Sequence, residues 1–142
     1  MDSKNGICYT QIRVRYAETD KMGVAYNSHY LTWFEVGRTE LLRNIGYTYE
    51  ELENMGYRLP LIEAGIKYLK PVLYDDLVTI VSKVSEKPGV RLRIVYDIIK
   101  DSEVVANGFT EHAFTDESLH PVKPPVHIRN RFIDLWEKSN VV

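Results

Sequence analysis

The residues with the clearest chemical potential lie in a short loop near the N-terminus. Asp20 supplies a carboxylate, and Gly23 allows a tight turn or a close approach of the backbone to a ligand. Asn27 and Ser28 follow as good helix N-caps, since their side chains can accept hydrogen bonds from first-turn N–H groups. The free N–H groups and positive dipole end of a helix start stabilise a developing oxyanion. A carboxylate facing such donors has the two parts that a hydrolytic site needs.

The segments around this loop have the patterns of regular secondary structure. Residues 7–15 alternate between apolar and polar side chains, which predicts a first strand. From Ser28 to about Ile45 apolar residues recur at helical spacing, which predicts one long helix that ends at Gly46. Gly37 lies inside the apolar face at a cost of roughly 1 kcal/mol relative to alanine. We therefore expect the helix to approach a sheet closely at Gly37.

The remaining chain is expected to form a short helix, four strands and a last helix. Thr48 and Glu51 match a capping box, which predicts a helix over residues 48–55. The strands are expected at residues 59–69, 77–85, 91–100 and 103–115, and the last helix at residues 127–138. A long helix and one antiparallel sheet bury both apolar faces only if the sheet wraps around the helix. The pattern therefore predicts an α+β fold.

The loop and the long helix share a spaced pattern with a known family. The pattern consists of Tyr16, Thr19, Asp20, Gly23, Val24, Tyr26, Asn27, Tyr30, Phe34, Glu35 and Arg38. It resembles the 4-hydroxybenzoyl-CoA thioesterase family of hotdog-fold acyl-CoA thioesterases, and most closely the bacterial YbgC/FadM-like branch. The resemblance extends from about residue 11 to about residue 115. It implies a hotdog fold, with an antiparallel sheet wrapped around one long central helix, in a single domain over residues 1–142.

The resemblance also implies hydrolysis of an acyl-CoA thioester to a free acid and CoA. Asp20 matches the catalytic aspartate of the family, which would act as nucleophile on the thioester carbonyl or as general base on water. Asn27 matches the helix-start position whose backbone N–H polarises that carbonyl. Better-known relatives carry Tyr or His there, so the change to Asn leaves side-chain assistance and substrate preference open. Without the resemblance, Asp20 would be read as an ordinary turn-forming aspartate.

Four further residues are expected to contact the substrate. We expect Gly23 to lie beside the thioester and Tyr26 to line the acyl pocket. Basic residues on the later strands contact the nucleotide in this family, which implies that role for Arg91 and Arg93. Guanidinium groups suit it, because they bind phosphates well.

Other side chains near the loop are expected to have structural roles. Glu35 and Arg38 are one helical turn apart and could pair, although Glu35 is also the fallback catalytic carboxylate. His29 lies at the helix start, where the dipole disfavours a charged imidazole, so we expect a structural or surface histidine. Tyr16 is expected to pack against its neighbours.

Three other functions are compatible with the sequence. The chain could be a non-catalytic module that binds acyl thioesters, a reading motivated by the unusual Asn27. It could hydrolyse acyl groups carried on acyl-carrier protein instead of CoA. Hydration or dehydration of a β-hydroxyacyl thioester ranks last, because such enzymes pair a histidine with a carboxylate and only His29 lies near the loop.

Bulk properties narrow the class of protein. The net charge of −2 provides no field that would attract nucleic acid or acidic lipid. A single cysteine, Cys8, excludes an intrachain disulfide, and the sequence has neither a signal peptide pattern nor an apolar run of membrane-spanning length. We expect a cytoplasmic protein without metal or cofactor.

Thioesterases of this fold build their sites between two subunits, which implies a homodimer or a homotetramer, and an open edge strand supports this.

Overall fold

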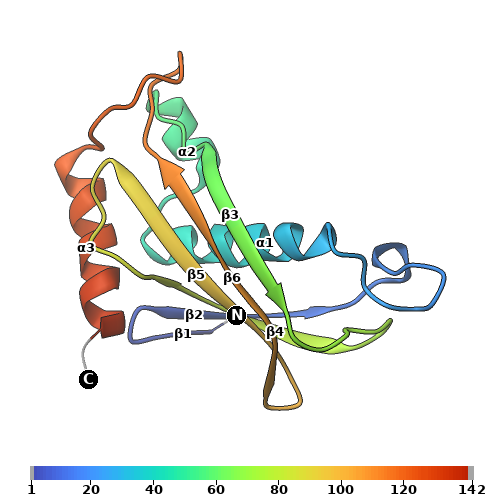
Figure 1. Cartoon of the computed structure of the whole chain (residues 1–142). Coiled ribbons are helices and arrows are strands. Elements are labelled where there is room, and N and C mark those ends of the chain that lie inside the picture. Colours follow the sequence, from blue (N-terminus) through green and yellow to red (C-terminus); the bar gives the residue numbers. More distant parts are fainter. Residues whose placement is uncertain (1, 141–142) are drawn as a thin grey trace.

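One antiparallel sheet curves around helix α1 (His29–Asn44), and two further helices lie near the C-terminal end of α1 (Figure 1). The computed structural model describes residues 2–140, and the side chains of residues 5–140. The six strands are β1 (Asp2–Lys4), β2 (Ile7–Arg13), β3 (Leu61–Tyr68), β4 (Leu77–Val84), β5 (Arg91–Lys100) and β6 (Glu103–Ala113). Their order across the sheet is β1-β2-β4-β5-β6-β3, and every neighbouring pair is antiparallel.

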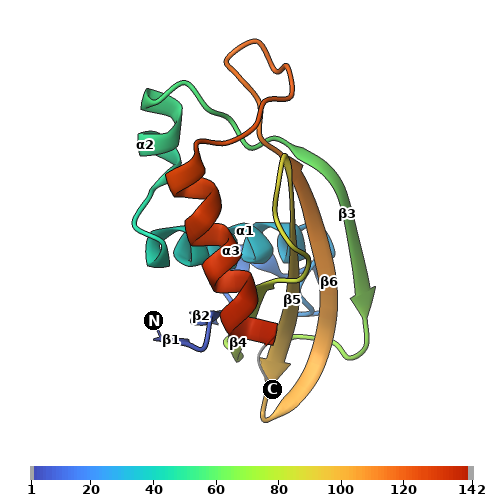
Figure 2. The ribbon, with the colours of Figure 1, turned by 90° about the vertical axis from the view of Figure 1, so that its left-hand side faces the viewer.

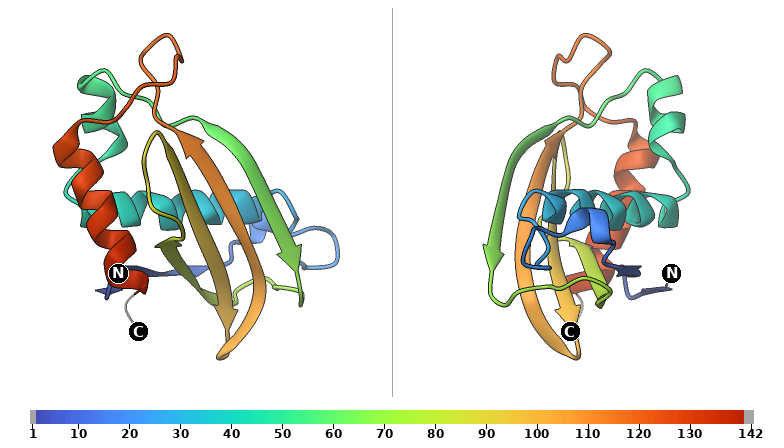
Figure 3. Two further views of the ribbon diagram at one scale, coloured as in Figure 1. Left: turned by 60° about the vertical axis from the view of Figure 1, so that its left-hand side comes forward. Right: turned by 90° about the vertical axis from the view of Figure 1, so that its right-hand side faces the viewer.

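The concave face of the sheet holds the core. Alternate residues of β5 point toward α1 and are buried, namely Leu92, Ile94, Tyr96 and Ile98. Figures 2 and 3 show that α1 and α3 (Val126–Asn140) both lie on this concave side, while the convex side has no helix over it. Because the convex face is uncovered, the strands bury one set of side chains only, as an alternating pattern requires.

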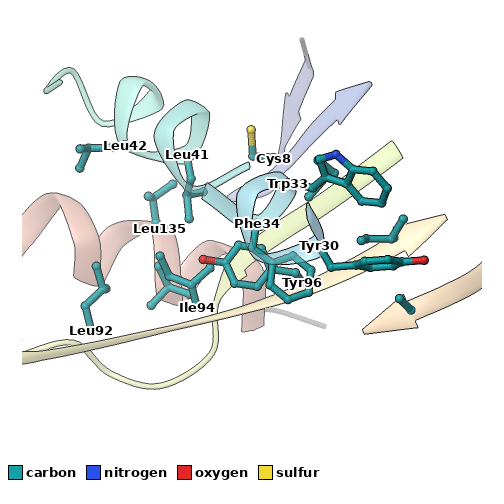
Figure 4. Packing of buried hydrophobic residues seen from close by; sticks show 14 of the residues in the cluster. Cys8, Tyr30, Trp33, Phe34, Leu41, Leu42, Leu92, Ile94, Tyr96 and Leu135 are labelled. Atoms are coloured by element: carbon teal, nitrogen blue, oxygen red, sulfur yellow. The ribbon is translucent and has the colours of Figure 1, made fainter. Parts of the chain in front are cut away.

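Helix α1 crosses the sheet at very short range. An alanine Cβ at Gly37 would contact the Ser82 hydroxyl and would lie 2.8 Å from Ile80 Cγ2, so only glycine fits here. One turn earlier, the Phe34 ring stacks on the Tyr96 ring (Figure 4), and their centroids are 4.3 Å apart. The close approach expected at Gly37 is therefore confirmed, together with a sheet wrapped around one long helix.

Most predicted elements are present within one to three residues of their expected ends. Helix α2 (Tyr49–Asn54) begins as predicted, because the Thr48 hydroxyl accepts the Glu51 N–H at 3.1 Å. Gly46 ends α1 with φ near +90°, a left-handed conformation that glycine adopts without strain. The short strand β1 and a turn of 3₁₀-helix, η1 (Tyr16–Glu18), were not anticipated.

Two local predictions were wrong. Ser28 does not cap α1 with its side chain, because its backbone already has helical angles (φ −64°, ψ −22°) and the side chain makes no cap hydrogen bond. No ion pair joins Arg38 and Glu35 in the part of the chain that the structure describes. Its guanidinium turns toward the sheet and α2, where it donates to the hydroxyls of Tyr49 and Tyr96. The single domain expected over residues 1–142 includes residues 1, 141 and 142, which lie outside the described part of the chain.

Candidate active site

The loop between η1 and α1 folds back on itself like a small hairpin. The Tyr26 N–H donates to the Glu18 carbonyl at 2.8 Å, and the Asp20 N–H donates to the Val24 carbonyl at 2.8 Å. Gly23 turns the chain at the tip with φ near +76° and donates its N–H to the Asp20 carbonyl at 3.0 Å. In Figure 1 this loop lies at the end of α1 opposite α2 and α3. Gly23 is needed for its backbone angle, since no described atom lies within 4 Å of the place of a Cβ.

The carboxylate of Asp20 is held by one of its two oxygens. Asp20 Oδ1 accepts the Met22 N–H at 2.8 Å and the Val24 N–H at 3.2 Å. No donor from the described residues contacts Oδ2, and the side chain is exposed. The carboxylate is therefore fixed in direction while one oxygen stays available to a ligand or to water.

The start of α1 leaves backbone donors open beside this loop. The N–H groups of Tyr26 and His29 donate to carbonyls of the loop, whereas those of Asn27 and Ser28 donate to none of the described residues. The Asn27 carbonyl accepts the Tyr68 hydroxyl at 3.3 Å, which ties the helix start to β3. Two exposed N–H donors at the positive end of a helix form an arrangement that binds an oxyanion.

Glu18 is a buried carboxylate at the base of the loop, and sequence reasoning missed it. It is only 4% exposed, and it accepts the Arg15 N–H and the Trp33 indole N–H, each at 2.8 Å. Burial raises its pKa, but these hydrogen bonds and the Arg15 guanidinium, 3.5 Å from Oε1, together outweigh burial and leave the pKa below its usual value. The available signal was Trp33, because an indole N–H on the buried face of a helix needs an acceptor.

The tyrosines in and beside the loop are largely exposed. Tyr26 is 57% exposed and Tyr16 is 76% exposed, and Tyr16 meets only the edge of the Tyr74 ring at a centroid distance of 5.7 Å. Tyr16 thus packs against one neighbour, as expected, but it stays largely exposed. It follows a strand that has already ended, so no core element covers it. Tyr26 is free to contact a ligand, as its expected role requires.

The two predicted CoA-binding arginines lie elsewhere in the chain. Arg91 and Arg93 alternate with the buried Leu92 and therefore project from the convex face, away from α1. Arg91 pairs with Glu111 at 3.3 Å, and the Arg93 guanidinium lies 3.9 Å from the centroid of the Phe109 ring. They also lie at the start of β5, roughly 30 Å and 23 Å along the strand from its last residue, Lys100. One chain does not bring them to the loop.

Thus the structure gathers four of the six predicted site residues into one loop. Asp20, Gly23, Tyr26 and Asn27 lie together, while Arg91 and Arg93 do not. The fallback carboxylate Glu35 is exposed on α1, about 12 Å along the helix from Asn27. Of these two carboxylates, Asp20 is the one that lies in the same loop as the Asn27 and Ser28 N–H groups.

Comparison with known proteins identifies the family. Residues 14–132 match the model of the thioesterase-like superfamily. The chain belongs to the thioesterase-like superfamily. This membership confirms the resemblance drawn from the loop and helix pattern, and with it the enzyme class, thioester hydrolysis. The matched segment of this thioesterase-like chain includes the whole Asp20 loop and all of α1.

Individual relatives of the thioesterase-like chain agree with this assignment. YneP of Bacillus subtilis, named as a proposed acyl-CoA thioesterase, is 34% identical over 115 residues, which cover 80% of this chain and 83% of YneP. The acyl-CoA thioesterase YbgC of Haemophilus influenzae is 28% identical over 130 residues, covering 90% of this chain and 95% of YbgC.

A solved structure supports the fold of this thioesterase-like chain. The DHNA-CoA thioesterase from Staphylococcus aureus has 30% sequence identity and a TM-score of 0.80, with 94% of this chain and 88% of that chain covered. The expected hotdog fold is thereby confirmed.

No helix within residues 2–140 has the length and apolar character to span a membrane.

Proposed function

We propose that the protein hydrolyses acyl-CoA thioesters at the Asp20 loop. The observation that carries the proposal is the pairing of an oriented carboxylate, with Oδ2 open, and two open N–H donors at Asn27 and Ser28. A thioester needs few catalytic parts, because a thiolate is a better leaving group than an alkoxide or an amine. A carboxylate and an oxyanion site are sufficient for this reaction class.

In the proposed reaction, the thioester carbonyl oxygen accepts hydrogen bonds from the Asn27 and Ser28 N–H groups. Asp20 Oδ2 then either attacks the carbonyl carbon or removes a proton from an attacking water. In the first course the C–S bond breaks, CoA leaves as a thiolate, and water hydrolyses the resulting mixed anhydride. In the second course the tetrahedral intermediate collapses directly to the acid and CoA. Both courses use the same open oxygen.

Substrate binding is proposed to involve the rest of the loop and a second subunit. Tyr26, exposed and next to Asn27, would contact the acyl group, and the turn at Gly23 would lie beside the thioester. Arg91 and Arg93 would contact the CoA nucleotide. Because they lie far from the loop within one chain, this contact would come from another copy of the chain.

We further propose that the protein is at least a homodimer through strand β3. This strand is an edge of the sheet and exposes the apolar side chains of Leu61, Ile62 and Tyr68. An open apolar edge favours pairing with a second strand, and two copies of one edge can pair antiparallel about a two-fold axis. Tyr68 also bonds to the Asn27 carbonyl, so the paired edge would lie beside the site.

Light scattering tests the assembly. The expected mass is that of two or four chains, and an Ile62→Lys variant is expected to shift the protein toward smaller species, because a lysine on an edge strand opposes pairing. A wild-type monomer at working concentration would contradict the shared site.

The catalytic assignment is tested by thiol release from short, long and aromatic acyl-CoAs. Asp20→Asn is expected to lower kcat by at least about 100-fold. The fold should persist, because the Asn side-chain oxygen can still accept the Met22 and Val24 N–H groups. The matched control is Asp97→Asn, an exposed aspartate on the convex face, which should keep full activity.

Each outcome distinguishes the alternatives. Wild-type turnover by Asp20→Asn would reject the role of Asp20. Release from acyl-carrier-protein substrates alone would reject CoA as the carrier, and acyl-CoA binding without release would favour the non-catalytic module.

A further inference from the structure

Glu18 is the most deeply buried acidic side chain near the site, yet it is not one of the groups that would touch the substrate. A buried carboxylate is costly unless its oxygens are satisfied. Here Oε1 accepts the Arg15 N–H and Oε2 accepts the Trp33 indole N–H. Oε1 therefore caps η1 at Arg15, two residues after β2 ends, whereas Oε2 holds helix α1.

The backbone of Glu18 makes the third connection. Its carbonyl accepts the Tyr26 N–H at 2.8 Å and so closes the base of the loop that carries Asp20. Asp20 lies two residues beyond Glu18 on one arm of this loop, and Asn27 follows Tyr26 on the other arm. The two arms are thus joined at Glu18, and Glu18 is anchored through Trp33 to the helix whose first N–H groups are open.

We propose that Glu18 is a positioning residue, which holds the Asp20 carboxylate in register with the N–H groups at the start of α1 through its bond to the Trp33 indole. This inference rests on the proposed function. Its physical basis is that catalysis depends on the relative placement of two groups, and a misplacement of about 1 Å can cost about 100-fold in rate. In Glu18→Gln, the NH₂ group of the side-chain amide would face either the Arg15 N–H or the Trp33 indole N–H. One of the two hydrogen bonds would therefore be lost.

The test compares Glu18→Gln with the wild type by steady-state thiol release from the best acyl-CoA substrate. We expect kcat to fall by about 10-fold to 100-fold while KM stays within about twofold, because the lost interaction affects alignment in the transition state. Trp33→Phe removes the hydrogen bond between the indole and Glu18 Oε2 and should lower kcat in the same direction. The double variant should lose much less than the product of the two single effects.

Loss of stability alone is separated by a matched control. Ile128→Val removes one buried methyl group of α3, far from the loop, and typically costs about 1 kcal/mol. It should reduce the unfolding midpoint without reducing kcat of the folded protein. If Glu18→Gln does not fold, Trp33→Phe alone carries the test.

The possible results separate the two proposals. Wild-type kcat in Glu18→Gln or in Trp33→Phe, or activity that only follows the folded fraction as in the control, would overturn the positioning role while the proposed function stands. A wild-type protein that releases no thiol, or an Asp20→Asn variant with full activity, would overturn the proposed function and the positioning role with it.

Discussion

The two ends of helix α1 carry polar clusters of opposite character. At the C-terminal half, Arg38 donates to Tyr96 at 3.4 Å, the Tyr96 hydroxyl donates to Thr110 at 2.6 Å, and the Thr110 hydroxyl donates to His112 Nε2 at 2.9 Å. His112 Nδ1 in turn donates to the Leu59 carbonyl at 3.2 Å. These directions follow because a carbonyl can only accept, which places the imidazole proton on Nδ1.

At the N-terminal end the groups are incompletely paired. Asp20 Oδ2 and the N–H groups of Asn27 and Ser28 have no partner among the described residues. Buried polar groups must be satisfied within the protein, whereas exposed ones can be satisfied by water or by a substrate. The hydrogen-bonded network from Arg38 to His112 is therefore structural, whereas the N-terminal cluster keeps donors and an acceptor that could bind a ligand.

Replacing Thr110 by valine should cause the largest loss of stability, because Thr110 lies in the middle of the network from Arg38 to His112. The change leaves two buried groups, the Tyr96 hydroxyl and His112 Nε2, without their partner, and we expect a loss of about 3 kcal/mol in the free energy of unfolding. Urea unfolding measures it. Thiol release per folded molecule should stay at the wild-type value, the reverse of Asp20→Asn. If Thr110→Val lowered kcat without lowering stability, the network from Arg38 to His112 would not be purely structural.

The same cluster predicts a pH dependence of stability. Burial, and then the nearby Arg38 cation, lower the pKa of His112 from 6.5 to about 4. The unfolded state therefore takes up a proton between these values while the folded state does not, so stability falls as the pH is lowered through this window. The full effect, reached near the lower value, is roughly 3 kcal/mol.

Urea unfolding across this pH range checks the effect, with His112→Gln as the control that lacks the titrating group. The slope of stability against pH should be smaller in the variant. Equal slopes would show that His112 is not held neutral. Glu18, whose pKa is depressed, adds a separate loss of stability at lower pH, as the pH falls below its ordinary value of 4.5.

The smallest expected effect comes from Tyr68→Phe, which sharpens the description of the N-terminal end. The variant removes the hydroxyl that contacts the Asn27 carbonyl at 3.3 Å but keeps the ring beside Tyr30. A neutral bond of this length contributes about 1 kcal/mol or less, so kcat/KM should fall by no more than about fivefold. A loss comparable to that of Asp20→Asn would mean that the helix start depends on β3 far more than its one contact indicates.

Patterns local to the chain predicted most of the fold and singled out the loop that carries the candidate site. Apolar residues at helical spacing identified α1, and alternation identified the inward face of β5, since both depend on neighbours within one element. The spaced pattern around Asp20 identified the loop and the helix start through its family resemblance. Ser28 was mistaken for a side-chain cap because a cap depends on backbone angles that composition does not reveal.

Contacts between groups far apart in the chain became evident only from the folded structure. Glu18 and Trp33 are fifteen residues apart, and their bond exists because the loop folds back onto α1. Arg38 donates to the hydroxyls of Tyr49 and Tyr96, and not to Glu35 one helical turn away, because its guanidinium lies between the sheet and α2. Most helices and strands follow from the sequence alone, because short-range periodicity and turn chemistry predict them, whereas the candidate loop was identified by its family resemblance. Packing determined which polar groups are satisfied and which stay open, since that depends on contacts between elements far apart in the chain.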